Sequence, residues 1–153
     1  MTMWNNVILC LGSNTDCEAN LKSAASLLRA YFGSIRFSEA IYTEPIGLSD
    51  SGLFLNQVAV AGTNASLEEV RRAVKAMEKR LGRMSDSKQK GKIPIDIDLL
   101  LWNGTILKPA DWEKEYVQLL FQSVAYGSYD DERGNTYSPS PDTPDQFIGD
   151  HGT

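Results

Sequence analysis

The residues best suited to chemistry are two aspartates in an otherwise apolar run, Ile93–Trp102. Residues two apart in a β-strand share one face, so Asp96 and Asp98 would lie side by side, about 7 Å apart at their α-carbons. Aspartate is a poor strand residue, and like charges on one face repel each other. Mg²⁺ removes that repulsion, and it prefers one or two carboxylates together with substrate phosphate oxygens. The pair therefore indicates metal-assisted phosphoryl transfer, and two solvated surface aspartates are the alternative.

The strand that carries the pair has two distinct faces. Its odd-numbered residues are all apolar and are predicted to face the core: Ile93, Ile95, Ile97, Leu99 and Leu101. The even face carries Asp96 and Asp98 and then turns apolar at Leu100 and Trp102. This alternation predicts that both carboxylates point to the same side of a sheet, near the entering end of the strand.

Periodic apolar positions and turn residues predict six elements in the order strand, helix, strand, strand, helix, strand. They are Val7–Leu11, Glu18–Tyr31, Ile35–Tyr42, Phe54–Ala61, a helix from Ser66 to Leu81, and Pro94–Trp102. Ser66 followed by Glu69 forms a capping-box pattern, and Asn103-Gly104 predicts a hairpin turn. This order is typical of the ferredoxin-like α+β fold, an antiparallel sheet with helices packed mainly on one face.

A last helix is predicted after the hairpin, and an acidic tail follows it. The helix is indicated by apolar residues at helical spacing: Trp112, Tyr116, Leu119, Leu120 and Val124. From residue 127 onward six acidic residues stand against one basic residue, which accounts for the whole net charge of −5. We therefore predict one catalytic-type domain over residues 1–126 and a Pro-, Gly- and Ser-rich tail over residues 127–153, docked on or near it.

The composition excludes several classes of partner. Residues 1–126 are balanced in charge and carry no basic stripe, so a nucleic-acid surface is not expected. No apolar run approaches the roughly 18 residues of a membrane span, and no basic amphipathic helix suits anionic lipid. The two cysteines make no disulfide framework, and Met1–Leu11 lacks the flanks of a signal peptide. We expect a cytoplasmic protein that is a monomer or a weak dimer.

Five short motifs, in order, resemble those of the hydroxymethyl-dihydropterin pyrophosphokinase family. They are Ile8–Asn14, Thr43–Gly47, Phe54–Asn56, Glu78 with Gly82-Arg83, and Gly91–Asp98. Members of that family move a diphosphate from ATP to a pterin alcohol in folate biosynthesis. The resemblance therefore implies a Mg²⁺-dependent transferase with the ferredoxin-like fold, acting on two small molecules, ATP and a dihydropterin.

The resemblance also assigns roles to single residues on the pterin side. Asn56 would bind the amide-like edge of the pterin, because a carboxamide offers both donors and an acceptor. Phe54 would form part of the pterin slot through ring contact. The backbone of Thr43, Pro45 and Ile46 would line that slot.

On the nucleotide side, Asp96 and Asp98 would hold two Mg²⁺ ions that bridge the ATP phosphates, and Arg83 would act near those phosphates. Glu78 would lie near the nucleotide or the metal. A set of lysines in the preceding loop would add phosphate-directed charge: Lys88, Lys90 and Lys92. We predict that the loops Thr43–Gly52 and Arg83–Lys92 are mobile without ligand and close over ATP.

The sequence departs from the family pattern on that same side. Lys92-Ile93 stands where the family has Pro-Arg, and Lys108–Glu113 lacks the family's histidine and arginine. Weakened activity, a changed donor or a loss of catalysis therefore stays open. One alternative is a non-catalytic relative that binds a pterin or a nucleotide. Another is a ferredoxin-like interaction domain with no cleft beside Asp96 and Asp98.

Overall fold

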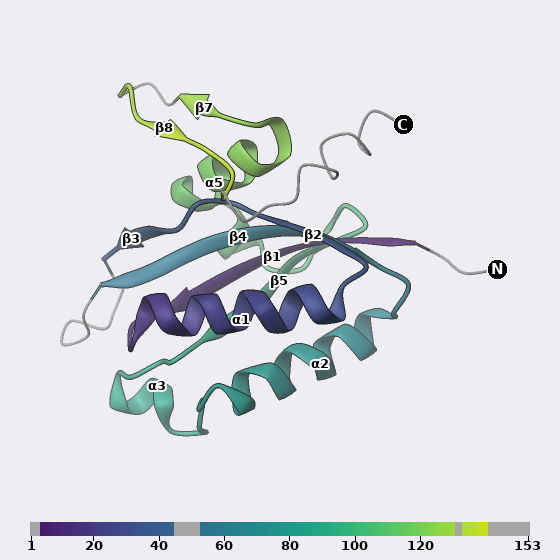
Figure 1. Cartoon of the computed structure of the whole chain (residues 1–153), viewed down its shortest axis with the longest axis vertical. Helices are drawn as coiled ribbons and strands as arrows, with labels where there is room; N and C mark the ends of the chain where they lie inside the picture. The colour runs from purple at the N-terminus through teal and green to yellow at the C-terminus, as the bar shows by residue number, and fades with distance from the viewer. Residues whose placement is uncertain (1–3, 45–52, 131–132, 141–153) are drawn as a thin grey trace.

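The computed structural model describes residues 4–44, 53–130 and 133–140 (Figure 1). Pro45 and Ile46, proposed for the pterin slot, lie outside these residues. The elements in chain order are β1 (Asn5–Ser13), α1 (Cys17–Tyr31), β2 (Ser34–Phe37), β3 (Ile41–Thr43), β4 (Phe54–Thr63), α2 (Leu67–Arg80), α3 (Ser87–Lys90), β5 (Asp96–Trp102), β6 (Thr105–Ile106), α4 (Pro109–Trp112), α5 (Glu115–Tyr126), β7 (Tyr129–Asp130) and β8 (Thr136–Tyr137).

The main sheet has β1 at its centre. Its strand order is β2-β4-β1-β5-β6, with β3 also paired to β4, and every pairing is antiparallel. Since β2 and β3 share the edge next to β4, they together take the place of one strand of a four-stranded core. The ferredoxin-like α+β fold expected from the element order is confirmed.

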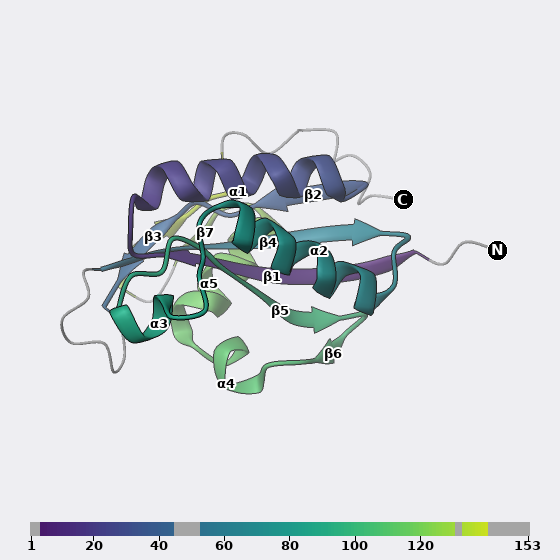
Figure 2. The same ribbon diagram turned by 90° about the horizontal axis from the view of Figure 1, so that it is seen from below.

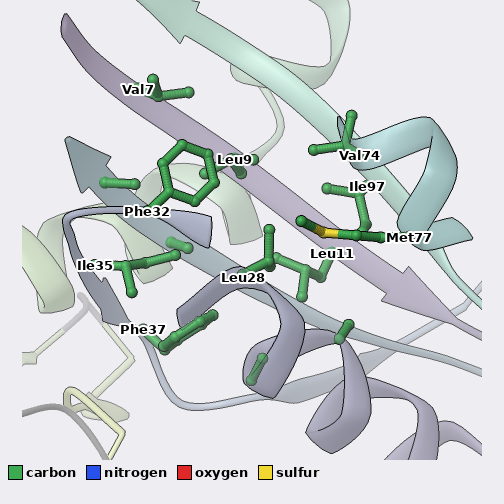
Figure 3. Close-up of a cluster of buried hydrophobic side chains, with 14 of the residues drawn as sticks. Val7, Leu9, Leu11, Leu28, Phe32, Ile35, Phe37, Val74, Met77 and Ile97 are labelled. Atoms are coloured by element: carbon green, nitrogen blue, oxygen red, sulfur yellow. The ribbon is translucent and has the colours of Figure 1, made fainter. Parts of the chain in front are cut away.

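Helices α1 and α2 lie on one face of the sheet, and α5 lies across the other (Figures 1 and 2). The core under α1 and α2 is built from alternate strand residues such as Leu9 and Leu11, which meet Leu28 of α1 and Met77 of α2 (Figure 3). A second cluster under α5 contains Val58, Leu100, Val117, Leu120 and Val124. The sheet is therefore covered on both sides.

Helix α2 begins as predicted. Ser66 accepts a hydrogen bond from the backbone N–H of Glu69, and the Glu69 carboxylate accepts one from the N–H of Ser66. The predicted strand Ile35–Tyr42 is instead two strands. Its ladder breaks because the Ser38 hydroxyl, in place of a backbone carbonyl, accepts the hydrogen bond from the N–H of Val58 at 2.9 Å.

The predicted alternation of faces along β5 holds only as far as Leu99. Ile97 and Leu99 pack under α1 and α2, and Leu100 packs under α5, as expected. Leu101 then also lies on the α5 side, and Trp102 packs on the α1 and α2 side, opposite to the prediction. A register shift between β1 and β5 adds one residue here, and such a bulge inverts every later side chain.

Two predicted segments contain more structure than expected. The loop Arg83–Lys92 includes the short helix α3. The last helix is divided into α4 and α5, because Lys114 has an extended backbone (φ −61°, ψ 137°) that interrupts the helical path. Neither change moves the two aspartates.

The beginning of the tail contacts the sheet. Strands β7 and β8 form a small hairpin. Beyond it, the N–H of Ser140 donates to the carbonyl of Phe37 at 2.8 Å, and the N–H of Glu39 donates to the carbonyl of Ser138 at 3.1 Å. Within the described residues, no helix combines the length and the apolar character that crossing a membrane would require.

Candidate functional site

Asp96 and Asp98 lie where two cavities meet. Strand β6 pairs only with Leu101 and Trp102, so β5 is itself the edge of the sheet at the two aspartates. One cavity, of about 280 Å³, lies between the sheet and the α4–α5 segment, and we call it the α5-side cavity. The other, of about 370 Å³, lies between β5 and α2, and we call it the α2-side cavity. Both aspartates line both cavities, so a group held by them can face either space.

Arg83 fixes the first aspartate. Its guanidinium donates to Asp96 Oδ1 at 2.7 Å and to the carbonyl of Ile95 at 3.2 Å. The same nitrogen lies 3.5 Å from Glu78 Oε2. The arginine therefore joins the end of α2 to the start of β5, and its charge is directed at Asp96.

Glu78 is a buried carboxylate at the end of α2. Only 8% of it is exposed, and its Oε2 accepts the backbone N–H of Ile97 at 2.8 Å. Burial raises its pKa, while the Ile97 hydrogen bond and the Arg83 charge oppose that rise. Glu78 thus holds β5 and Arg83 in position from beneath the α2-side cavity.

Lys108 holds the second aspartate. Its Nζ lies 2.5 Å from Asp98 Oδ1. Burial raises the pKa of Asp98, and the charge of Asp96 raises it further, while Lys108 lowers it. Burial alone would lower the pKa of Lys108, but the hydrogen bond and the charge of Asp98 raise it overall. Both shifts have the signs expected for a shielded acid beside a second acid and a base.

The donor set suits a divalent cation that also binds substrate. Asp96 and Asp98 each accept a hydrogen bond from a cationic side chain at Oδ1, and the two carboxylates also contact each other. In the described part of the chain, no three His, Cys, Asp or Glu side chains gather into a metal-holding group. Two carboxylates without a third ligand fit Mg²⁺, which completes its shell with water and phosphate oxygens.

Asn56 forms part of the wall of the α5-side cavity. It is only 5% exposed, and its Nδ2 donates to the Thr43 hydroxyl at 2.6 Å and to the carbonyl of Phe54 at 3.2 Å. The strand pairing Gly12↔Asn56 brings its Oδ1 close to Gly12, where an added Cβ would lie 3.5 Å from it. The absence of a side chain at Gly12 therefore keeps space open next to the amide.

Aromatic and weakly polar groups complete this cavity. Phe54 is half-buried and would lie 3.7 Å from a Cβ at Gly12, while Cys10 and Tyr116 contribute further lining. Burial, with the charges of Asp98 and Asp96, raises the pKa of Cys10 to about 12. Its thiol is therefore protonated at neutral pH, so it is no nucleophile.

Two of the three lysines proposed for the nucleotide, Lys90 and Lys92, lie away from the two cavities. Lys88 and Lys90 are in α3, where the exposed Lys90 pairs with Asp86 at 2.9 Å, and Lys92 is also exposed. Lys90 and Lys92 are not among the described residues that line either cavity. Asn14 holds the end of this segment: its Nδ2 donates to the carbonyl of Gly91 at 2.7 Å, and its Oδ1 accepts the N–H of Ile93 at 2.6 Å.

Four basic residues instead line the α2-side cavity: Arg71, Lys75, Arg83 and Lys108. Of these, only Arg83 was expected from the sequence. The position of Lys108 follows from the hairpin, because pairing Trp102 with Thr105 and Leu101 with Ile106 brings residue 108 back beside the start of β5. Arg71 and Lys75 are one helical turn apart on α2, so their side chains lie on the same face of the helix, toward β5. This helical spacing is the sequence signal that could have identified them.

A family model described as 7,8-dihydro-6-hydroxymethylpterin-pyrophosphokinase (HPPK) matches residues 8–126. The chain belongs to this family. The resemblance drawn from the five motifs is thereby confirmed, and members of this family use ATP as a co-substrate. The match includes both cavities' strands and the helices that flank them.

Among characterised relatives, the HPPK-family chain is similar to the 2-amino-4-hydroxy-6-hydroxymethyldihydropteridine pyrophosphokinase of Porphyromonas gingivalis. The two are 30% identical over 134 residues, covering 78% of this chain and 90% of that protein. It is also similar to the folate synthesis bifunctional proteins of Arabidopsis thaliana and Pisum sativum, at 29% and 32% identity over 76% of this chain. This chain spans about a quarter of the length of those two, 26% and 24%.

Proposed function

We propose that this chain transfers the diphosphate of ATP to the hydroxymethyl group of 6-hydroxymethyl-7,8-dihydropterin, with Mg²⁺, in folate biosynthesis. One observation carries the proposal: Asp96 and Asp98 lie on the border between a cavity with an amide and an aromatic wall and a cavity with a cationic wall. A transfer between two substrates requires such a border, with each reactant on its own side.

The α5-side cavity is the proposed pterin site. Asn56 would face the amide edge of the pterin, since its side chain is already fixed by Thr43 and Phe54 and loses little freedom on binding. The ring of Phe54 offers an apolar surface to a flat heterocycle. The empty space at Gly12 admits the ligand beside both groups.

The α2-side cavity is the proposed nucleotide site. Arg83 and Lys108, which already contact the aspartates, would lie beside the β- and γ-phosphates. Arg71 and Lys75 are exposed and form no ion pair with the described residues, so their charges are available to phosphate. They would supply part of the positive charge that the family pattern places in the segment before the aspartates.

In the proposed reaction, the hydroxymethyl oxygen of the pterin attacks the β-phosphorus of ATP in line, and its hydroxyl proton is released to solvent. The bond between that phosphorus and the oxygen bridging to the α-phosphate breaks, and AMP leaves with the bridging oxygen. Asp96 and Asp98 would hold Mg²⁺, which neutralises charge developing on the phosphates. The family resemblance implies two such ions. The protein's own contribution is to position the reactants and exclude water between the cavities.

A decisive assay follows AMP release from ATP, Mg²⁺ and the dihydropterin alcohol. We expect turnover in the wild type and its loss in a variant with both Asp96→Ala and Asp98→Ala. The matched control is Asp86→Ala, which removes an aspartate paired with Lys90 away from both cavities. Turnover that survives the double substitution would refute the metal role, and no AMP release from the wild type would refute the proposed reaction.

The second candidate is a non-catalytic relative that binds a pterin or a nucleotide. It is favoured by one observation: Lys108–Glu113 lacks the histidine and arginine of the family pattern. Calorimetry separates the two candidates, because pterin binding without ATP binding or turnover supports only the second. The third hypothesis, a domain without a cleft, conflicts with the two cavities beside Asp96 and Asp98. The cytoplasmic location and the monomeric or weakly dimeric state stay predictions.

A further inference from the structure

Lys108 is delivered to Asp98 by a constrained backbone. The N–H of the preceding residue, Leu107, donates to the carbonyl of Leu100 at 2.8 Å, which ties it to the hairpin with β5. On the other side, Pro109 begins α4, and the carbonyl of Lys108 accepts the N–H of Trp112 at 2.9 Å. The residues before and after Lys108 are thus both held in place, so the Lys108 backbone has a fixed position next to β5.

The ammonium group lies where a ligand of Asp98 would lie. Lys108 Nζ is 2.5 Å from Asp98 Oδ1, and the Asp98 side chain is only 24% exposed. Short contacts of this kind between an ammonium and a shielded carboxylate are charge-assisted and stronger than neutral hydrogen bonds. An ion that bound the same oxygen would have to displace Lys108 or share the carboxylate with it.

The charge balance points the same way. Asp96 and Asp98 carry two negative charges, and Arg83 and Lys108, each in direct contact with one of them, carry two positive charges. A second divalent ion placed between these groups would meet an ammonium at close range and be repelled by it, although the Lys108 side chain is 48% exposed and water screens part of that repulsion. One divalent ion, held by the two carboxylates and substrate oxygens, meets less of that repulsion.

We propose that the Lys108 ammonium takes the place of one of the two divalent ions implied by the family resemblance, so that this chain binds a single ion at Asp96 and Asp98. This inference rests on the proposed function for its biological meaning, but the number of bound ions is measurable without turnover. Lys108 is then a positioning residue that holds Asp98 and adds a fixed positive charge at the phosphates.

The test counts Mn²⁺ ions bound per chain by electron paramagnetic resonance of the free ion, first with Mn²⁺ alone. It is repeated with saturating α,β-methylene-ATP, corrected for ions held by the analogue itself. We expect at most one ion per wild-type chain in either condition. Lys108→Met should bind two ions with the analogue, and Lys108→Arg, which keeps the charge, should bind one. The control Lys22→Met removes an exposed lysine of α1 that lines neither cavity and should match the wild type.

Two results would overturn the inference: two ions on the wild-type chain in either condition, or one ion on Lys108→Met with the analogue. Circular dichroism of each variant confirms that the count refers to folded protein. If the analogue binds neither the wild type nor any variant, the proposed function fails. The counts with Mn²⁺ alone then still decide whether Lys108 competes with an ion. In that case a gain in Mn²⁺ affinity of about tenfold in Lys108→Met supports the competition, and an unchanged affinity contradicts it.

Discussion

The two cavities beside Asp96 and Asp98 are built in opposite ways. The α5-side cavity is lined by strand residues together with Asp111, Lys114, Tyr116 and Val117 of the α4–α5 segment. Its key amide, Asn56, is buried, and its Nδ2 donates to Thr43 and Phe54. The α2-side cavity is lined by charged side chains, of which Arg71 and Lys75 are exposed on a helix surface. Buried hydrogen bonds hold side chains in a defined geometry, whereas exposed charges mainly set the local electrostatic potential. The α5-side cavity is therefore suited to recognising a ligand by its shape and hydrogen bonds, and the α2-side cavity to neutralising the charge of a ligand.

The aspartates belong to both regions, and the largest effect is expected there. Replacing Asp98 by Asn should lower kcat/KM by about 10³-fold, because the shared carboxylate is lost while the shape of both cavities stays. Binding of the pterin alone should change little, which calorimetry can measure. A loss confined to the KM for pterin would instead assign Asp98 to the α5-side cavity alone.

The same variant should be more stable than the wild type at neutral pH. The folded-state pKa of Asp98 is raised by burial and by Asp96, so the folded protein disfavours its charge relative to the unfolded chain. That unfavourable contribution is present at neutral pH and disappears as the pH falls through the folded pKa. The excess thermal midpoint of Asp98→Asn should therefore shrink as the pH falls toward the ordinary aspartate value of 3.8. A lower midpoint at neutral pH would show that the Lys108 ion pair outweighs burial.

The next largest effect tests the α5-side cavity. Asn56→Ala should weaken pterin binding by about 10- to 100-fold, since a truncated amide leaves a polar ligand edge without partners. The affinity for an ATP analogue should stay within about twofold, and calorimetry measures both. Gln57→Ala is the control, because Gln57 is the adjacent amide and donates to the carbonyl of Ser38 instead. Equal losses for both ligands would contradict the division between the cavities.

Sequence patterns were sufficient for the region under α1 and α2. Periodicity of apolar residues predicted the element order, and Ser66 with Glu69 predicted the start of α2, because both depend on interactions between near neighbours. The two aspartates were found for the same reason, since a strand alternates faces every residue. These features are local, and the five motifs extend them to the family.

The remaining features depend on contacts between distant residues. The extra residue at the bulge near Leu100 comes from pairing with β1, which no single strand reveals, and it inverts Leu101 and Trp102. Lys88, Lys90 and Lys92 were proposed for the nucleotide because they stand in the segment where the family has an arginine-bearing loop. The cations that actually line the α2-side cavity come from α2 and from the far end of the hairpin.

A smaller effect is expected on the α2 side, because exposed cations act together and are screened by salt. The double variant Arg71→Ala, Lys75→Ala should weaken binding of an ATP analogue by about tenfold and leave pterin affinity unchanged. The control is Arg72→Ala, Lys79→Ala, which removes two charges from the same helix that do not line this cavity. If the control variant loses as much, only the net charge of α2 matters, and the cavity lining does not.

The smallest effect is expected for Asn14, which lines neither cavity but holds a chain segment that contributes residues to both. Its two side-chain hydrogen bonds hold Gly91 and Ile93, and Ile93 lines the α5-side cavity at the end of the segment that begins with Arg83 on the α2 side. Asn14→Ala should lower the free energy of unfolding by about 1–2 kcal/mol and reduce both ligand affinities by only a few-fold.

Hydrogen exchange measures where this loss falls. In the wild type, amides from Ser87 to Ile93 should already be protected without ligand, against the expectation of a mobile loop, because Asn14 accepts the N–H of Ile93. In Asn14→Ala they should exchange faster, and an ATP analogue with Mg²⁺ should restore protection if this segment also closes over the nucleotide. Asn20→Ala is the control, since its amide donates to Thr15 within the neighbouring turn. An unchanged exchange pattern in Asn14→Ala would mean that the two cavities are positioned independently, each by its own helix.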